Sequence, residues 1–315
     1  MATTASDPLA SVSLKDAEEN PDEFAMKLGR SFKEYGFAIV ADHGIAGELI
    51  QRAEEKAKAF FALREEVKEK YFVPGGGGAR GYTPFGIETA KGAKAYDLKE
   101  FWHVGRDLPA GHRFRAHMPD NLWPSEVPNF RGTFGELYAA FDRTGRKILK
   151  AIARYLNVDE DYFEDAVRDG NSVLRALHYP PQNEPTGEHI RAGAHEDINA
   201  ITLLLGAEEA GLELLTKDGR WIPVSPRPGE LVINIGDMLQ RLTNGMLPST
   251  SHRVINPAPD RASHARYSMP FFLHFRSDFL IEALPQTLPS GERPKWPAIT
   301  ANDYLQERLR EIKLR

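Results

Sequence analysis

Residues 231–255 read LVINIGDMLQRLTNGMLPSTSHRVI, and this stretch sets the pattern for the second half of the chain. Two short apolar runs, Leu231–Ile235 and His252–Ile255, flank a segment that is punctuated by Gly, Asn and Pro. Short runs bounded by turn residues predict β-strands. The same rhythm recurs on both sides, at residues 173–179, 198–205, 212–215, 221–224 and 266–275.

Many short strands separated by turns favour a sandwich or barrel, of which a jelly roll is one form. Further out, apolar residues recur at helical spacing, and Phe37–Ala41 reads as one buried strand between two of these helices. The expected helices span residues 24–35, 49–61 and 132–156, with a last one beginning near Asn302. We therefore expect a mixed α and β fold: a double-stranded β-helix (jelly-roll) core with flanking helices and a helix–strand–helix N-terminal region.

The composition excludes several classes of function. The chain has 315 residues, with 40 Lys and Arg against 45 Asp and Glu, so its net charge of −5 offers no overall positive field for nucleic acid or an anionic membrane. The absence of cysteine excludes disulfides, thiolate metal sites and cysteine nucleophiles. Any metal must be bound by His, Asp or Glu.

The first residues, MATTASDPLASVSLKDAEEN, have neither a basic start nor an apolar segment. This pattern predicts no secretory signal. The longest strongly apolar run, around residues 200–207, is far shorter than the roughly 20 residues of a membrane helix. We expect a soluble, cytoplasmic protein without a membrane partner.

A Gly-rich segment, PGGGGARGYTPFG at residues 74–86, contains G-x-G-x-x-G at Gly76, Gly78 and Gly81. As a dinucleotide fingerprint this motif requires a preceding strand and a following helix. Here Tyr82-Thr83-Pro84 follows instead. We predict a loop, with a lid as its possible role, and no nucleotide site.

His195-Glu196-Asp197 is the first candidate for chemistry, because residues i and i+2 of an extended segment project to the same face. His252, at the start of another β-type run, offers a third ligand. Two imidazoles and one carboxylate form the facial triad of non-haem Fe(II) oxygenases. A zinc peptidase helix is disfavoured, since Asn199 stands where H-E-x-x-H requires histidine.

Arg266-Tyr267-Ser268 repeats the i, i+2 spacing downstream of His252. A guanidinium presents two parallel N–H donors to a carboxylate, and a neighbouring hydroxyl adds a further hydrogen bond. An interior arginine needs an anionic partner. Taken alone, an interior arginine favours a salt bridge to one of the chain's acidic residues, and the candidate triad upstream is what favours a ligand instead.

The order His195-x-Asp197, His252, Arg266-x-Ser268 resembles the 2-oxoglutarate and Fe(II)-dependent dioxygenases of the isopenicillin N synthase-like superfamily. The resemblance extends to residues 232–245 and 249–254, which are similar to the family's approach to its distal iron ligand. Residues 32–37 (FKEYGF) and 42–45 (DHGI) are similar to its N-terminal region. The resemblance thus covers most of the chain.

The resemblance implies that His195, Asp197 and His252 bind Fe(II). It also implies that Arg266 and Ser268 hold the distal carboxylate of 2-oxoglutarate, together with Tyr179. Many members have Asn two positions before that tyrosine, where this chain has Leu177. Glu196, between the ligands, should point away from the metal.

The implied organisation is an N-terminal non-catalytic dioxygenase region (7–125), a catalytic jelly-roll core (170–278) and a C-terminal tail with a helix (279–315). The implied reaction uses O2 and converts 2-oxoglutarate to succinate and CO2 while a small-molecule substrate is oxidised. Hydroxylation is the usual result, and desaturation or ring closure starts from the same substrate radical.

Candidate substrate contacts come from loops and strands expected around the mouth of the jelly roll: Arg80, Tyr82, Phe101, Trp102, Arg175 and Arg191. If Arg175 or Arg191 faces the cavity, the substrate is expected to be an anion such as an amino acid or another organic acid. Three alternatives stay open: an ethylene-forming type, an oxidase of the same superfamily that does not use 2-oxoglutarate, and a non-catalytic jelly-roll binding protein. The sequence leaves the oligomeric state undetermined.

Overall fold

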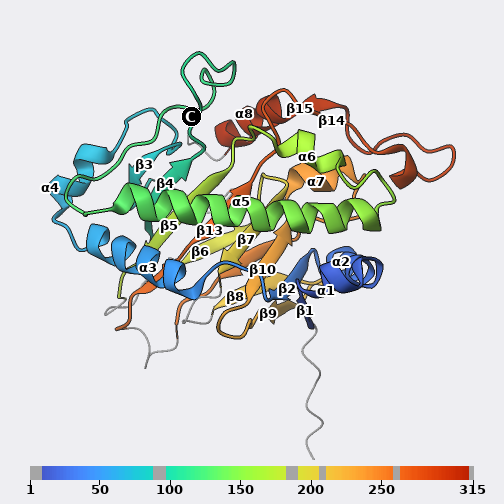
Figure 1. The fold of residues 1–315 in the computed structure, drawn as a ribbon, viewed down its shortest axis with the longest axis horizontal. Helices are drawn as coiled ribbons and strands as arrows, with labels where there is room; N and C mark the ends of the chain where they lie inside the picture. The colour runs from blue at the N-terminus through green and yellow to red at the C-terminus, as the bar shows by residue number, and fades with distance from the viewer. Residues whose placement is uncertain (1–8, 88–96, 182–190, 206–210, 258–262, 312–315) are drawn as a thin grey trace, which may run out of the picture.

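The computed structural model describes residues 9–87, 97–181, 191–205, 211–257 and 263–311, and its core consists of two main sheets (Figure 1). Along the large sheet the strands follow the order β1 (Ser11–Ser13), β2 (Phe37–Ala41), β10 (Leu231–Ile235), β7 (Ile201–Leu205), β13 (Pro270–Leu273), β5 (Val173–Tyr179), β4 (Glu100–Gly105) and β3 (Gly81–Thr83), with β12 (Arg266–Ser268) also paired to β5. The small sheet has the order β6 (Ala192–His195), β11 (His252–Val254), β8 (Leu212–Leu215) and β9 (Trp221–Pro223). All pairings in these two sheets except β1 with β2 are antiparallel.

The two sheets pack face to face, as expected for a jelly roll. Phe37, Ile39 and Val232 from the large sheet form one apolar cluster with Leu214 and Val254 from the small sheet. Alternate residues of the large sheet face the other way, into a larger core that they share with the helices. The inner face of the large sheet therefore looks toward the small sheet, and its outer face carries the helices.

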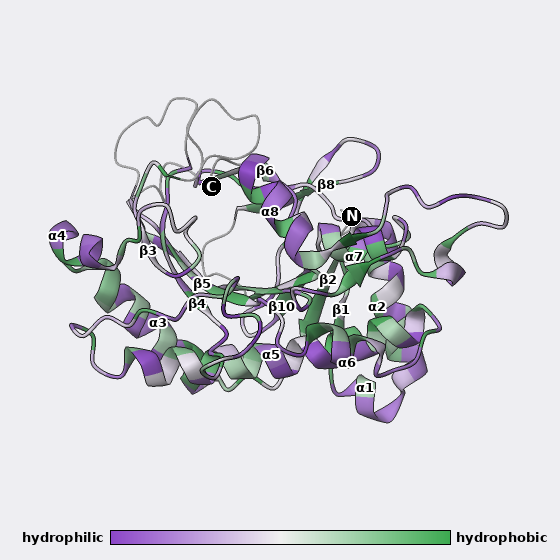
Figure 2. Cartoon of the chain, turned by 90° about the horizontal axis from the view of Figure 1, so that it is seen from above, coloured by the Kyte–Doolittle hydropathy of each residue, from purple (hydrophilic) through white to green (hydrophobic). Residues whose placement is uncertain are grey.

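The helices on the outer face are α2 (Pro21–Tyr35), α3 (Gly47–Phe61), α5 (Phe130–Tyr155) and α6 (Tyr162–Val167), which lie on one side of the large sheet in Figure 2. The long helix α5 follows its apolar stripe and stacks Phe141 on Phe271 of β13, with ring centroids 5.4 Å apart. Helix α2 begins at Pro21 and ends at Gly36, whose φ of 69° suits a left-handed cap. Short α1 (Asp16–Glu19), α4 (Glu65–Lys68) and a 3₁₀ turn, η1 (Glu69–Tyr71), complete this side.

The N-terminal strands extend the same sheet as the C-terminal strands. β2 pairs with β10, where Val40 is opposite Leu231, and β4 pairs with β5 along its whole length. The regions expected at 7–125 and 170–278 thus share one sheet and one apolar core.

Helix α8 (Ala301–Glu311) lies on the opposite side of the large sheet from α5 (Figure 2). It follows η3 (Pro285–Thr287) and a two-stranded ladder of β14 (Leu280–Ile281) and β15 (Ile299–Thr300). The Tyr304 hydroxyl donates to Asp237 Oδ2 at 2.8 Å, which ties α8 to α7 (Asp237–Leu242). The last part of the expected tail, residues 312–315, lies outside the described residues.

Several predicted boundaries were wrong. β3 forms inside the segment expected to be a loop, the run at 198–205 begins as a strand only at Ile201, and the run at 266–275 is divided into β12 and β13. Helix α7 and strand β4 were not predicted. Within the described ranges, none of the helices combines the length and the apolar character of a membrane span.

Candidate active site

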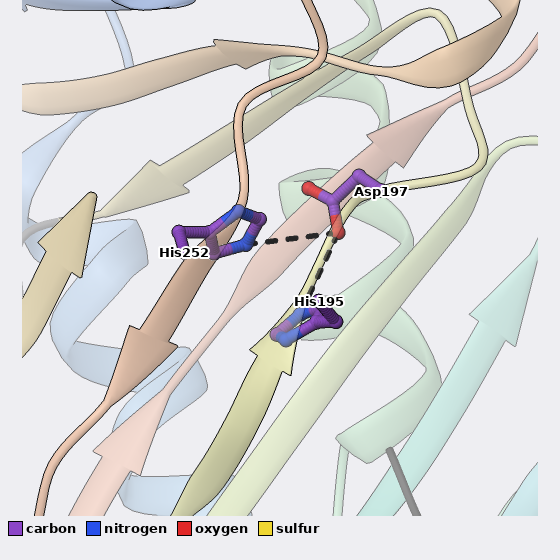
Figure 3. A group of neighbouring side chains, drawn as sticks. All are labelled: His195, Asp197 and His252. Atoms are coloured by element: carbon purple, nitrogen blue, oxygen red, sulfur yellow. Dashed lines mark ion pairs between the residues drawn. The ribbon is translucent and has the colours of Figure 1, made fainter. Parts of the chain in front are cut away.

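The small sheet brings together His195, Asp197 and His252, near the end of β6 and the start of the neighbouring strand β11 (Figure 3). His195 is the last residue of β6, and His252, the first of β11, is its direct partner across the ladder. Asp197 lies just beyond β6, and its Oδ1 is 3.9 Å from the Nε2 atom of each histidine. All three candidate ligand atoms lie within 4.8 Å of one another.

Backbone carbonyls set the tautomer of both histidines. The Nδ1 atom of His195 is 2.7 Å from Gly193 O, and that of His252 is 3.1 Å from Thr250 O. A carbonyl can only accept, so both Nδ1 atoms carry the proton and both Nε2 atoms keep a lone pair. Burial, followed by the neighbouring His252, lowers the pKa of His195 to about 4, so this imidazole is neutral at pH 7.

The carboxylate of Asp197 is oriented by the large sheet. Its Oδ2 accepts from the hydroxyl of Thr202 at 2.5 Å and from the amide of Asn234 at 2.7 Å. These residues lie on the inner faces of β7 and β10. Burial raises the pKa of Asp197, but the two histidines and these hydrogen bonds outweigh it, so the pKa lies below its ordinary value. The charged carboxylate therefore directs Oδ1 toward the imidazoles.

Two imidazole nitrogens and one carboxylate oxygen suit a divalent iron that keeps open positions for other ligands. Each ligand is held by a further hydrogen bond, as is usual for metal-binding side chains. No other cluster of this kind occurs among the residues that the structure describes. Glu196, as expected, is not part of the group and is exposed.

Arg266 and Ser268 both point inward from β12, while Tyr267 between them packs outward on His178. Arg266 is 3% exposed and Ser268 is 6% exposed. Across the ladder, Arg266 pairs with Tyr179 and its guanidinium lies 5.1 Å from the centroid of that ring. The inner surface thus holds a buried cation, a hydroxyl and a phenol together.

Arg191 lies beside the same tyrosine, with its guanidinium 6.0 Å from the ring centroid of Tyr179. It donates to the backbone oxygen of His264 at 3.2 Å. Leu177, where the resemblance leads to an expectation of Asn, packs with Phe101 and Tyr179 in a small apolar cluster. The surroundings of position 177 are therefore apolar.

A cavity of about 500 Å³ is lined by two of the three candidate ligands, His195 and Asp197. Its walls combine the ligand strand, the inner faces of β5 and β13, the Gly-rich segment and α8; they include Arg80, Lys99, Asn171, Val173, Arg175, Ile198, Phe272, His274, Leu305 and Leu309. Of the six expected substrate contacts, Arg80 and Arg175 line this cavity.

The other four do not line it among the described residues, so the prediction for them was wrong as far as this cavity is concerned. Tyr82 and Trp102 belong to an aromatic core around Phe60, and Trp102 lies 4.7 Å from it between ring centroids. Phe101 packs with Leu177 and Tyr179, and Arg191 is buried against Tyr179. The position of aromatic and basic residues near a Gly-rich segment indicates that they lie close to a site. It does not indicate which face of a strand each side chain occupies.

Sequence reasoning missed Thr202 and Asn234. The signal was present, since each is the polar residue in an otherwise apolar run, ITLLL and LVINI. Period-two alternation places each of them on the face opposite the apolar core. Asn171 and His274, which line the cavity just before β5 and just after β13, carried no such signal.

Comparisons with known proteins agree with this geometry. A family model described as the N-terminal region of non-haem dioxygenases in morphine synthesis matches residues 8–126. A second model, the 2OG-Fe(II) oxygenase superfamily, matches residues 170–275. A 2-oxoglutarate-Fe(II) type oxidoreductase of Emericella nidulans is 35% identical over 281 residues, which cover 86% of this chain and 79% of the relative.

Solved structures share the whole fold. A 2OG-Fe(II) oxygenase family protein from Caulobacter crescentus is 56% identical, with a TM-score of 0.90 over 96% of this chain and 99% of that chain. A full-length Neurospora crassa protein in complex with alpha-KG and thymine is 26% identical, with a TM-score of 0.87 over 98% and 99% of the two chains. This chain belongs to the 2-oxoglutarate–Fe(II) oxygenase superfamily, as a non-haem iron dioxygenase that uses Fe(II), 2-oxoglutarate and O2.

Proposed function

We propose that His195, Asp197 and His252 bind the Fe(II), and that Arg266, Ser268 and Tyr179 bind the distal carboxylate of 2-oxoglutarate. The observation that carries this proposal is the convergence of both Nε2 atoms on Asp197 Oδ1, while Oδ2 accepts hydrogen bonds from the protein. The position of Arg266 supports the second part: its guanidinium is buried on the inner face beside Ser268 and Tyr179, and its two parallel N–H donors match the geometry of a carboxylate.

The reaction consumes O2 and 2-oxoglutarate and releases succinate and CO2, while a C–H bond of the substrate becomes C–OH. Iron and 2-oxoglutarate, when bound, supply the oxidising chemistry. Thr202 and Asn234 hold the carboxylate of Asp197, and the carbonyls of Gly193 and Thr250 keep both Nε2 atoms unprotonated. Arg266 orients the co-substrate by its two parallel N–H donors.

The same reasoning supports different roles for three regions of the chain. We propose 170–278 as the catalytic core, 7–125 as a non-catalytic region and 279–315 as a tail. The core supplies the ligand set, whereas Arg80, Lys99 and His103 of the N-terminal region contribute cavity wall. The tail contributes Leu305 and Leu309.

The substrate is a small molecule that fits a cavity of about 500 Å³, and we propose that it is anionic. Arg175 supports the anionic character: it lines the cavity, its guanidinium lies 4.2 Å from the ring centroid of Phe101, and its Nε donates to His103 Nε2 at 2.6 Å. Unchanged turnover in Arg175→Ala would contradict this part of the proposal.

The test of the metal and co-substrate assignment is anaerobic. Fe(II) and then 2-oxoglutarate are added to metal-free protein, and the visible charge-transfer band of their chelate is recorded. The band should disappear in His195→Ala and weaken in Arg266→Ala. Iron binding without any band in the wild-type protein would contradict the assignment of the 2-oxoglutarate site.

A further inference from the structure

Arg80 has an unusual environment for a buried arginine. It is 5% exposed and lines the cavity just before β3. Its Nη1 donates to Ala79 O at 2.6 Å, while Nε and Nη2 are buried and have no hydrogen-bond partner among the described residues. A buried cation with unpaired N–H donors is expensive, so a native protein retains one only where something else offsets that cost.

The backbone at Gly105 leaves space for the guanidinium of Arg80. The guanidinium lies against Gly105 at the end of β4, where an added Cβ would come within 1.8 Å of Arg80 Cζ. Any residue other than glycine at position 105 would displace the cation. The absence of a Cβ at Gly105 therefore leaves the space that the guanidinium occupies.

Nearby acidic groups are already engaged. Asp107 accepts from the side-chain amide of Asn121 at 2.7 Å, and Asp120 accepts from Arg115 at 2.5 Å. Neither forms a salt bridge with Arg80. The neutralising partner of the guanidinium is therefore to be sought in the cavity.

Two further residues that line the cavity also have a buried polar atom without a hydrogen-bond partner in the described part of the chain. Asn171 Oδ1 and His274 Nδ1 are buried without hydrogen-bond partners among the described residues. They lie beside each other in the fold, because the backbone N–H of His274 donates to the hydroxyl of Ser172 at 3.1 Å. We call Arg80, Asn171 and His274 the Arg80 cluster.

The pattern of unpaired atoms specifies a ligand chemistry. Nε and Nη2 lie on the same edge of a guanidinium, so their N–H bonds form a fork that fits both oxygens of one carboxylate. Asn171 Oδ1 accepts only, so it needs a hydroxyl or amino donor. Val173, Phe272 and Ile198 offer apolar wall.

We propose that the substrate is a small carboxylic acid bearing a hydroxyl or amino group, with its carboxylate on Arg80 and its donor group on Asn171 Oδ1. This inference rests on the proposed function, since it names the substrate class of the same cavity. It separates the two carboxylates of the reaction: 2-oxoglutarate binds at Arg266, and the substrate binds at Arg80.

The first experiment compares Arg80→Met with Arg106→Met in metal-free protein. Arg106 is the matched control, a neighbouring part-buried arginine whose Nε donates to Gly170 O at 2.9 Å and whose Nη2 pairs with Asp142 at 2.7 Å. Arg80→Met should keep or raise the thermal unfolding midpoint, while Arg106→Met lowers it. A similar loss in both variants would make Arg80 a structural residue and overturn the proposal.

The second experiment uses a panel of hydroxy and amino acids of graded size, each beside its primary amide and beside the plain acid that lacks the hydroxyl or amino group. The anaerobic Fe(II)–2-oxoglutarate band is recorded first; its absence would count against the proposed function rather than this inference. With the band present, binding is measured by thermal shift and turnover by succinate release. Wild-type protein should prefer at least one acid to its amide by roughly tenfold or more, since a site with buried donors rejects a ligand that does not match them.

Arg80→Met should reduce that preference to near unity and leave the KM for 2-oxoglutarate unchanged. Asn171→Leu should reduce the preference for the hydroxy or amino acid over the plain acid. A wild-type protein that binds no acid of the panel, or an unchanged preference in Arg80→Met, means that cavity water satisfies these atoms, and the proposal fails. A raised KM for 2-oxoglutarate in Arg80→Met would also overturn it, by placing the co-substrate there.

Discussion

The metal-binding cluster (His195, Asp197, His252), of which His195 and Asp197 line the cavity, differs from the Arg80 cluster in the same cavity wall in how its polar atoms are satisfied. Around the metal-binding cluster, each histidine Nδ1 faces a carbonyl and Asp197 Oδ2 accepts two hydrogen bonds. In the Arg80 cluster, four buried nitrogen and oxygen atoms have no partner within the described ranges.

The difference indicates what each region binds. A cluster whose outer atoms are fixed by the protein is preorganised for one ligand of fixed geometry, such as a metal ion. A cluster with unsatisfied atoms is completed only when its ligand arrives, and it makes the free protein less stable than it could be. The predictions below test this contrast.

The largest effect is expected at the metal-binding cluster. His252→Ala removes one of three ligands and should reduce succinate release by roughly 10³-fold or more, because catalysis depends on the bound metal. The measurement is turnover at saturating Fe(II) and 2-oxoglutarate, with circular dichroism as a check of folding. The exposed Lys15→Ala serves as control, and activity retained in His252→Ala would remove this histidine from the site.

The next effect distinguishes the two arginines beside Tyr179. Arg266→Met should raise the KM for 2-oxoglutarate by about 10²-fold with a smaller change in kcat, since a buried charged hydrogen bond is worth several kcal/mol. Arg191→Met should raise it much less, because Arg191 donates to a backbone carbonyl. Steady-state kinetics in 2-oxoglutarate provide the comparison, and the reverse order would exchange the roles of the two residues.

A smaller effect concerns the hydrogen bonds that hold Asp197. Thr202→Val keeps the shape but removes the 2.5 Å bond to Oδ2, so Fe(II) affinity should fall about 10- to 100-fold. Thr133→Val is the matched control, since Thr133 is equally buried but its hydroxyl has no partner among the described residues. Metal titration measures both variants. If the Fe(II) affinity of Thr202→Val equals that of Thr133→Val, the hydrogen bond from Thr202 is not needed to orient Asp197. This result would contradict the contrast between the two clusters.

The last prediction is a gradual effect, a pH dependence of stability in the Arg80 cluster. Burial lowers the pKa of His274 to about 4, below the value of 6.5 expected in the unfolded chain. Between these values the unfolded state binds more protons, so His274 contributes stability above about pH 6.5 that is lost as the pH falls toward 4, by at most about 1.4 kcal/mol per pH unit.

Denaturant unfolding of metal-free wild type and His274→Phe from pH 7 to 4 measures this contribution. The variant should lose stability less steeply than the wild type over that range. His195 titrates in the same direction in both proteins, so only the difference between the two slopes is informative. Parallel slopes would show that His274 is not buried as a neutral group.

The metal-binding cluster could be foreseen because its signal is local. His195 and Asp197 are two residues apart, and Arg266 and Ser268 repeat this spacing on a strand whose alternation holds in the structure. The strands at 173–179 and 231–235 were predicted at their observed bounds, since compact apolar runs between turns leave little ambiguity.

Strand β4 could not be foreseen, because the residues that make it a buried strand lie elsewhere in the chain. Glu100 is 1% exposed, and its carboxylate accepts from Lys68 at 2.7 Å and from Tyr82 at 2.5 Å. A charged residue in a sequence predicts a surface position unless the residues that pair with it are known. Of the Arg80 cluster, only Arg80 was expected near the substrate, because a sequence pattern does not report which buried atoms of Asn171 and His274 lack hydrogen-bond partners among the described residues.

The pairing of β2 with β10 has a consequence for how the chain folds. Val40 and Leu231 are direct neighbours in the sheet although most of the chain separates them. Such distant contacts slow folding, because a long loop must close before the pairing stabilises it. During synthesis the apolar strand Phe37–Ala41 emerges long before its partner, so the nascent chain exposes an aggregation-prone edge, and this is the stage at which a chaperone would matter most.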